Sequence, residues 1–316
     1  MYASNCFYRD IATAGSARWF EDIDMKPARL MKIAALSASA LLLTGGGVVA
    51  SIPALRHIAV ALAHDPASLS PVPGDPRVRF EEGAENCAFG VAALLPRAVA
   101  VVEAAHGRPF RHDVNVGVFA SPESYASSNG LGASKPSGVS FLGRVTLSPT
   151  LCGPDRDRMG AVLTHELSHA HLQGWLSPLA FARLPSWFNE GLAVIVSDGG
   201  GAEGVSEQAA REAIADGYAI AIANEGSLFN LTAVNFVKEP PHGSFFETRL
   251  SVYRLAYREA AMFVAWLRRR DAAAFADFLQ RIEEGEPFAA TFEEKFGAGP
   301  RRSWEAFVSD LGDRAD

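Results

Sequence analysis

The 316-residue chain shows strand-like patterns in its first half and helical patterns in its second half. Residues 114–119 alternate valine with asparagine or glycine, which is typical of a half-buried strand. Residues 138–148 contain one or two further strands. Before them, residues 84–106 carry apolar side chains at helical spacing, and this pattern predicts a long helix in which Pro96 can cause a kink.

Helices dominate from residue 155 onward. Residues 155–174 and 184–197 are predicted to form two helices, the second ended by the three glycines at 199–201. Later helices are predicted over residues 205–216, 248–270, 272–283, 287–296 and 301–311. Strands early and helices late indicate an α+β domain over residues 77–316. We expect two lobes, 77–198 and 199–316, with a substrate cleft between them.

Residues 1–64 are predicted to be a leader. An uncharged apolar run begins at Ile33 and follows three basic residues, the layout of a signal peptide or an N-terminal membrane anchor. Because residues 33–54 are just long enough to span a bilayer, a cleaved signal and a retained anchor both stay open. Residues 1–24 are mixed and polar, so Met25 or Met31 is a candidate initiator. Either interpretation predicts that the body is exported, to the periplasm or another extracytoplasmic space.

Residues 65–76 (DPASLSPVPGDP) are rich in proline and serine and predict a linker between leader and domain. The body beyond the leader is acidic. Residues 1–64 carry a net charge of +2, which leaves 23 Lys and Arg against 32 Asp and Glu, a net of −9, for the rest. This charge argues against nucleic acid as the partner, because phosphate backbones bind to clustered basic residues.

The chain has three cysteines, which decide whether a disulfide can form and whether a cysteine can bind metal. Cys6 lies in the leader, whereas Cys87 and Cys152 lie in the body. An oxidising compartment permits a disulfide between the last two, and the alternative is a pair of buried thiols. Neither has the spacing to another Cys or His that a zinc site requires.

The strongest chemical signal is the HExxH pattern that runs from His165 through Glu166 to His169. Histidines at i and i+4 lie one above the other on one helix face and can bind the same metal ion. The intervening Glu166 can take a proton from metal-bound water. A catalytic zinc needs a third protein ligand and leaves its fourth position to water. Glu190, in the stretch WFNEGLA, is the candidate, because a reversing connection lets a second helix lay it against the first.

HELSH followed by WFNEGLA resembles the gluzincin branch of the zinc metallopeptidases, most closely the compact, thermolysin-like "peptidase MA-like" domains. The resemblance covers roughly residues 76–312. It implies a zincin-like fold with a small N-terminal sheet, an active-site helix and a helical C-terminal lobe. It also implies a Zn²⁺ ion bound by His165, His169 and Glu190, with Glu166 as the general base.

The same resemblance implies a tyrosine that donates to the oxyanion from the helix after the site. Tyr257, at the head of YREAAMFVAWL, fits this role, and Tyr253 lies one turn earlier on the same face. The alternative for Tyr257 is a buried aromatic anchor. Family members often carry an acidic residue four positions after the third ligand, to support a zinc-bound histidine. Here that position is Val194, and Asp198 is a candidate substitute.

Together these features predict an exported zinc endopeptidase that acts on a peptide or protein. We expect an extended substrate to pair with the strand near residues 145–148, as with an edge strand. No GxMEN-like stretch supports exopeptidase activity. Two alternatives stay open: a catalytically silent, zinc-stabilised scaffold or binding module at the envelope, and a selective or autoproteolytic processing enzyme. Trp187 and Phe188 are expected in the core, and His171 is expected to be structural or exposed. The oligomeric state is left open.

Overall fold

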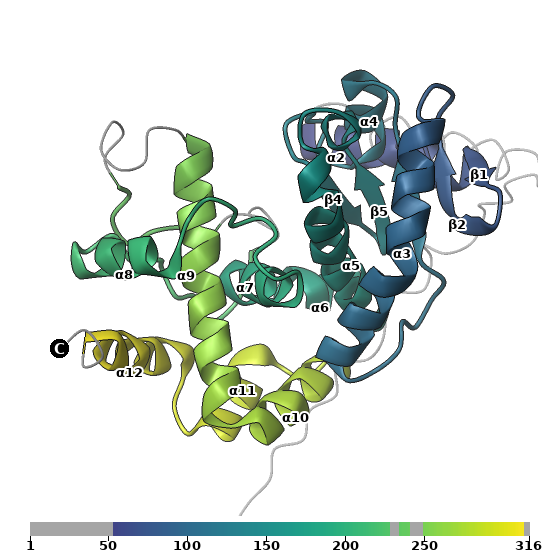
Figure 1. Ribbon diagram of the computed structural model, residues 1–316. Helices are drawn as coiled ribbons and strands as arrows, with labels where there is room; N and C mark the ends of the chain where they lie inside the picture. Colours follow the sequence, from purple (N-terminus) through teal and green to yellow (C-terminus); the bar gives the residue numbers. More distant parts are fainter. Residues whose placement is uncertain (1–52, 228–233, 241–248, 313–316) are drawn as a thin grey trace, which may run out of the picture. The chain divides into compact units, whose positions relative to one another are not determined.

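The computed structural model describes residues 53–227, 234–240 and 249–312, and its fold is a mixed α/β arrangement dominated by helices (Figure 1). Residues 57–316 form one compact unit. The boundary between two lobes at residues 198 and 199 stays a prediction. Most of the candidate signal or anchor at 33–54 lies outside the described residues. Its last two residues begin helix α2 (Pro53–Ala63).

Five strands among the described residues form one mixed sheet in the order β1-β2-β3-β5-β4. They are β1 (Ser70–Val72), β2 (Asp75–Phe80), β3 (Asn115–Val118), β4 (Gly138–Phe141) and β5 (Arg144–Leu147). β3 pairs in parallel with β2 and β5, while β1 and β4 add antiparallel edges. The prediction of an edge strand at 145–148 was therefore wrong, since β5 lies between β3 and β4.

Residues 65–76 are part of the fold, so the prediction of a linker was wrong. Pro66 begins the short 3₁₀ helix η1 (Pro66–Ser68) and lies so close to β3 that a Cβ on Gly117 would be 2.9 Å from it. Gly74, in the turn between β1 and β2, has a φ of 93°, which glycine adopts without strain. The composition was misleading because tight turns and edge strands use the same prolines and glycines as linkers.

Helix α3 (Glu85–His106) and the motif helix α5 (Met159–Trp175) pack against each other and against the sheet. α3 contacts β2, and α5 contacts β4 and β5. Cys87 and Cys152 form a disulfide with Cα atoms 5.2 Å apart, which joins α3 to the 3₁₀ helix η2 (Pro149–Cys152). Among the described helices, α3 is long and apolar enough to span a membrane, but Val91, Leu95 and Val102 bury one face of it in the core.

The remaining helices follow the predicted pattern to within a few residues. They are α4 (Pro122–Ser128), α6 (Pro178–Ala182), α7 (Ser186–Val196), α8 (Glu207–Ala215), α9 (Arg249–Arg270), α10 (Ala272–Glu283), α11 (Phe288–Phe296) and α12 (Pro300–Gly312). Two features differ from the prediction. Helix α6 was not predicted, and the motif helix begins later than predicted, after the 3₁₀ helix η3 (Arg156–Arg158).

Helix α7 lies directly on α9, and this contact holds the third candidate ligand in place. A Cβ on Gly191 would lie 2.6 Å from the carbonyl oxygen of Ala260, so only glycine permits this approach. Trp187 and Phe188 are fully buried and pack against aromatic rings of α9, α10 and α11. Their predicted place in the core is confirmed. The resulting rigid packing fixes the direction in which α7 presents its next residues.

Candidate metal centre

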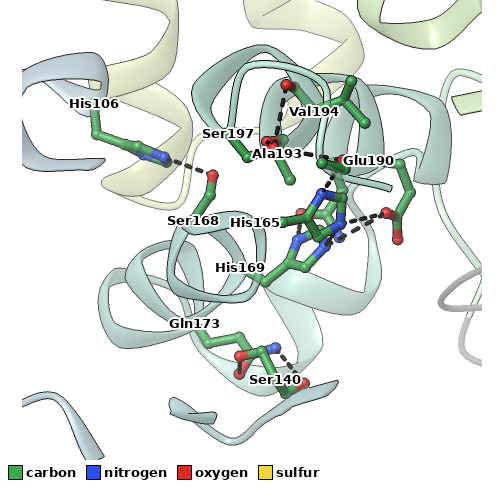
Figure 2. A network of polar contacts seen from close by, with 12 residues as sticks. His106, Ser140, His165, Ser168, His169, Gln173, Glu190, Ala193, Val194 and Ser197 are labelled. Atoms are coloured by element: carbon green, nitrogen blue, oxygen red, sulfur yellow. Dashed lines mark hydrogen bonds and ion pairs between the residues drawn. The ribbon is translucent and has the colours of Figure 1, made fainter. Parts of the chain in front are cut away.

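Helices α5 and α7 bring together the side chains of His165, His169 and Glu190. The Nε2 atoms of the two histidines lie 3.1 Å apart, and Glu190 Oε2 lies 3.2 Å and 3.4 Å from them (Figure 2). All three residues are buried, with at most 7% of their surface exposed. Three donor atoms this close together, on three side chains shielded from water, can bind one metal ion.

Hydrogen bonds on the far side of each imidazole fix its orientation. His165 Nδ1 donates to the carbonyl oxygen of Gly200 at 2.9 Å, and His169 Nδ1 donates to Asn189 Oδ1 at 3.0 Å. Because each Nδ1 is used by these hydrogen bonds, the Nε2 atoms of both rings point toward Glu190. Metal-binding histidines are generally oriented by such partners.

Asp198 was suggested as an acidic residue that supports one of the two histidines, but neither histidine is oriented by it. Asp198 is exposed, and Val194 is buried against Ala202 and Ala261. The loop instead brings Gly200 so close to α5 that a Cβ there would lie 2.7 Å from the Ala161 carbonyl oxygen. Neither Gly200 nor Asn189 was predicted from the sequence as a histidine partner. The one available signal was that Asn189 directly precedes the third candidate ligand.

The charges of the centre are strongly coupled. Burial is the largest single influence on His169 and acts to lower its pKa, but the charge and hydrogen bond of Glu190, the charge of Glu166 and the hydrogen bond to Asn189 together outweigh it and raise that pKa to about 9. Burial likewise acts to raise the pKa of Glu190, but His169 and His165 hold it at about 2. The two side chains attract each other as an ion pair, and a cation that binds between them displaces a proton from His169.

Glu166 lies beside the three candidate ligands and under strand β4. It is 8% exposed, and burial is the main reason why its pKa is raised. The backbone N–H of Ser140 donates to its carboxylate, and a Cβ on Gly138 would lie 2.7 Å from Glu166 Cγ. Gln173 holds strand and helix together, since its Nε2 donates to the Ser140 carbonyl and its Oε1 accepts from the Ser140 hydroxyl (Figure 2).

Two tyrosines border the same centre. Tyr257 on α9 lies over His165, with ring centroids 6.2 Å apart and planes 12° from parallel. Burial is the main reason why its pKa is raised well above 10, followed by the charges of Glu190 and Glu166. Tyr253, by contrast, is 38% exposed. Tyr125 on α4 is fully buried, and the charge of Glu166 adds to burial in raising its pKa. No motif marks Tyr125, and the sequence analysis missed it.

A cavity of about 480 Å³ lies away from this centre, beside the Cys87–Cys152 disulfide. None of the three candidate ligands lines it, so it does not correspond to the substrate cleft that was expected between two lobes. The chain was also compared with models of protein families, with curated proteins and with solved structures, and none of the three comparisons returned a match.

Proposed function

We propose that this protein is an exported zinc-dependent endopeptidase of the gluzincin type, with a zincin-like fold. The observation that carries the proposal is the convergence of His165 Nε2, His169 Nε2 and Glu190 Oε2 beside a buried glutamate. A purely structural metal site has no need of that glutamate. The disulfide between Cys87 and Cys152 supports export, because disulfides persist in oxidising compartments.

The donor set and its spacing fit zinc. Two imidazoles and one carboxylate form a common catalytic zinc site, with ligand bonds of about 2.0–2.1 Å. Tetrahedral geometry then places ligand atoms roughly 3.3–3.4 Å apart. The distances of 3.1, 3.2 and 3.4 Å between the donor atoms agree with this value. Zinc bound there would lower the pKa of a water molecule and polarise the scissile carbonyl.

The protein's own residues then move the protons. Glu166 accepts a proton from the attacking water and delivers it to the amine that leaves. Its raised pKa suits this role, because a general base works best when its pKa lies near the working pH. The hydroxyl of Tyr257 donates a hydrogen bond to the oxyanion that develops on the former carbonyl.

Strand β4 supplies the substrate-binding edge in this proposal. It is the terminal strand of the sheet on the side of α5, and its Ser140 and Gly138 lie against Glu166. An extended peptide that adds to this edge through main-chain hydrogen bonds would bring its backbone close to the base. Main-chain recognition of this kind accepts many side chains.

The deciding experiment compares the wild-type chain with Glu166→Gln. Both proteins are assayed for zinc content and for cleavage of a peptide library. Glu166→Gln should keep its zinc and lose nearly all turnover, because the amide cannot accept the proton. Glu81→Gln is the matched control, since Glu81 lies in the sheet region and contacts Ser124 rather than the centre. Equal cleavage by Glu166→Gln and wild type would refute the mechanism.

A catalytically silent scaffold module is the alternative. Its one supporting feature was the apolar Val194, but the histidines have other orienting partners in Gly200 and Asn189. The same digest separates the two functions. A scaffold would bind zinc in both wild type and Glu166→Gln and would cleave nothing in either form.

A further inference from the structure

A second buried cluster of two histidines and a glutamate lies on the other side of the motif helix α5, and we call it the rear cluster. His106 ends α3, His171 lies on α5 and Glu283 ends α10. The cluster and the candidate zinc centre use different faces of α5, because two residues turn a helix by about 200° and His171 follows His169 by two. The side chains of all three residues in the cluster are completely buried.

Three donor atoms of this rear cluster point at one another. Glu283 Oε1 lies 3.0 Å from His106 Nδ1 and 3.2 Å from His171 Nδ1. The two imidazole rings are close, with centroids 4.2 Å apart. Arg108 Nη1 donates to Glu283 Oε2 at 3.1 Å, which orients the carboxylate and leaves Oε1 for the two imidazoles.

The outer nitrogens of both rings are held by oxygen atoms. His106 Nε2 lies 3.0 Å from the hydroxyl of Ser168 (Figure 2), and His171 Nε2 donates to the carbonyl oxygen of Arg108 at 3.1 Å. This is the arrangement that orients metal-binding histidines.

The contact between His171 and Glu283 has no hydrogen bond in it. The outer Nε2 of His171 is used by the carbonyl of Arg108, and Nδ1 faces the Glu283 carboxylate. Nδ1 makes no hydrogen bond, although it is fully buried and only 3.2 Å from Oε1. A divalent cation placed among these atoms would be coordinated by Nδ1 and by the carboxylate together, as the closeness of the three donor atoms allows.

We propose that His106, His171 and Glu283 bind a second, structural metal ion of the class that prefers imidazole and carboxylate ligands, with zinc as the ion to test. The ion joins α3, α5 and α10 from inside the core and supports the helix that carries the HExxH residues. This inference does not depend on the proposed peptidase function.

The test counts and locates zinc. Three proteins are compared: the full chain, a His165→Ala/His169→Ala variant and a His106→Gln/Glu283→Gln variant. Each is loaded with zinc, freed of excess metal and analysed for zinc by plasma mass spectrometry. Circular dichroism shows whether each protein is folded. We expect two zinc ions in the wild type and one in each variant. In the His165→Ala/His169→Ala variant, removal of the remaining ion should lower Tm by roughly 5–10 °C, because a bound ion stabilises the native state.

The outcomes separate the two proposals. One zinc in the wild type and none in folded His165→Ala/His169→Ala would overturn the second site and leave the peptidase centre intact. The opposite result is also possible: the wild type binds one zinc, His165→Ala/His169→Ala keeps it and His106→Gln/Glu283→Gln loses it. That result would support the second site and overturn the first. If either variant fails to fold, anomalous scattering at the zinc edge from wild-type crystals decides. A peak beside His171 supports the proposal, and its absence there overturns it.

Discussion

The two His/His/Glu clusters on α5 share one donor set and differ in almost everything around it. At the candidate zinc centre the Nε2 atoms converge, a second carboxylate stands beside them, and each side chain keeps 5–9% of its surface exposed. At the rear cluster the Nδ1 atoms converge, the neighbour is the guanidinium of Arg108, and no side-chain surface is exposed. Arg108 itself stacks on Trp175 with its Cζ 3.6 Å from the ring centre.

The identity of the donor atoms alone therefore does not decide what a metal site does. A buried base that can exchange protons with a substrate indicates a catalytic role. A guanidinium that neutralises a ligand carboxylate indicates a structural role, because a buried carboxylate needs a partner charge. We therefore expect changes at the candidate zinc centre to affect turnover and changes at the rear cluster to affect stability.

Removal of one ligand from each cluster should give the largest contrast. His169→Ala should lose the catalytic ion and all measurable turnover, because two remaining ligands form a poor site. Glu283→Gln should keep near wild-type turnover at temperatures where it is folded but should unfold at a lower Tm. Metal content, peptide cleavage and thermal unfolding are measured on both proteins. Loss of turnover in folded Glu283→Gln would contradict the division of roles.

Tyr257→Phe should reduce turnover by roughly 10²-fold or more without loss of zinc, because the hydroxyl contributes mainly to the transition state. The ring remains and can still lie over His165. Tyr253→Phe is the matched control, one turn away and more exposed. A purely structural Tyr257 would make the Phe variant nearly silent, and only Tyr257→Ala would then do harm, through stability.

Asn189→Ala should weaken zinc binding by about 10–100-fold, since it removes the acceptor that orients His169. Competition with a chelator of known affinity measures the change. Asn86→Ala, on the exposed side of α3, is the control and should bind zinc as the wild type does. If Asn189→Ala also binds zinc as tightly, the hydrogen bond has no role in the centre.

Zinc affinity should depend on pH through His169. The pKa of this imidazole is raised to about 9, so below pH 9 the ring is protonated and zinc must displace that proton. Affinity should fall by about tenfold for each pH unit below 9 and level off above it. Chelator competition between pH 7 and 9.5 tests the slope. A flat profile between pH 7 and 8.5 would indicate an ordinary histidine pKa.

Local periodicity was enough to find most of the first centre. His165, Glu166 and His169 lie within five residues of one helix, so their geometry follows from the helical repeat. Glu190 was found through its motif, and α7 presents it as predicted. The linker failed because composition does not reveal strand pairing. β2 joins the sheet by pairing with β3, which lies more than 30 residues further along the chain.

Most helices and the pairing of His165, Glu166 and His169 could be predicted from the chain alone, because they depend on contacts within one or two helical turns. Glu190 needed a motif match, because it lies on another helix. The order of the sheet, the backbone carbonyl of Gly200 as a histidine partner and the place of Tyr125 near Glu166 became visible only in the folded protein. The tertiary structure alone assembled the rear cluster, in which His106 and Glu283 are 177 residues apart. Such pairs are specified by packing of whole helices, for which no short stretch of sequence carries a signal.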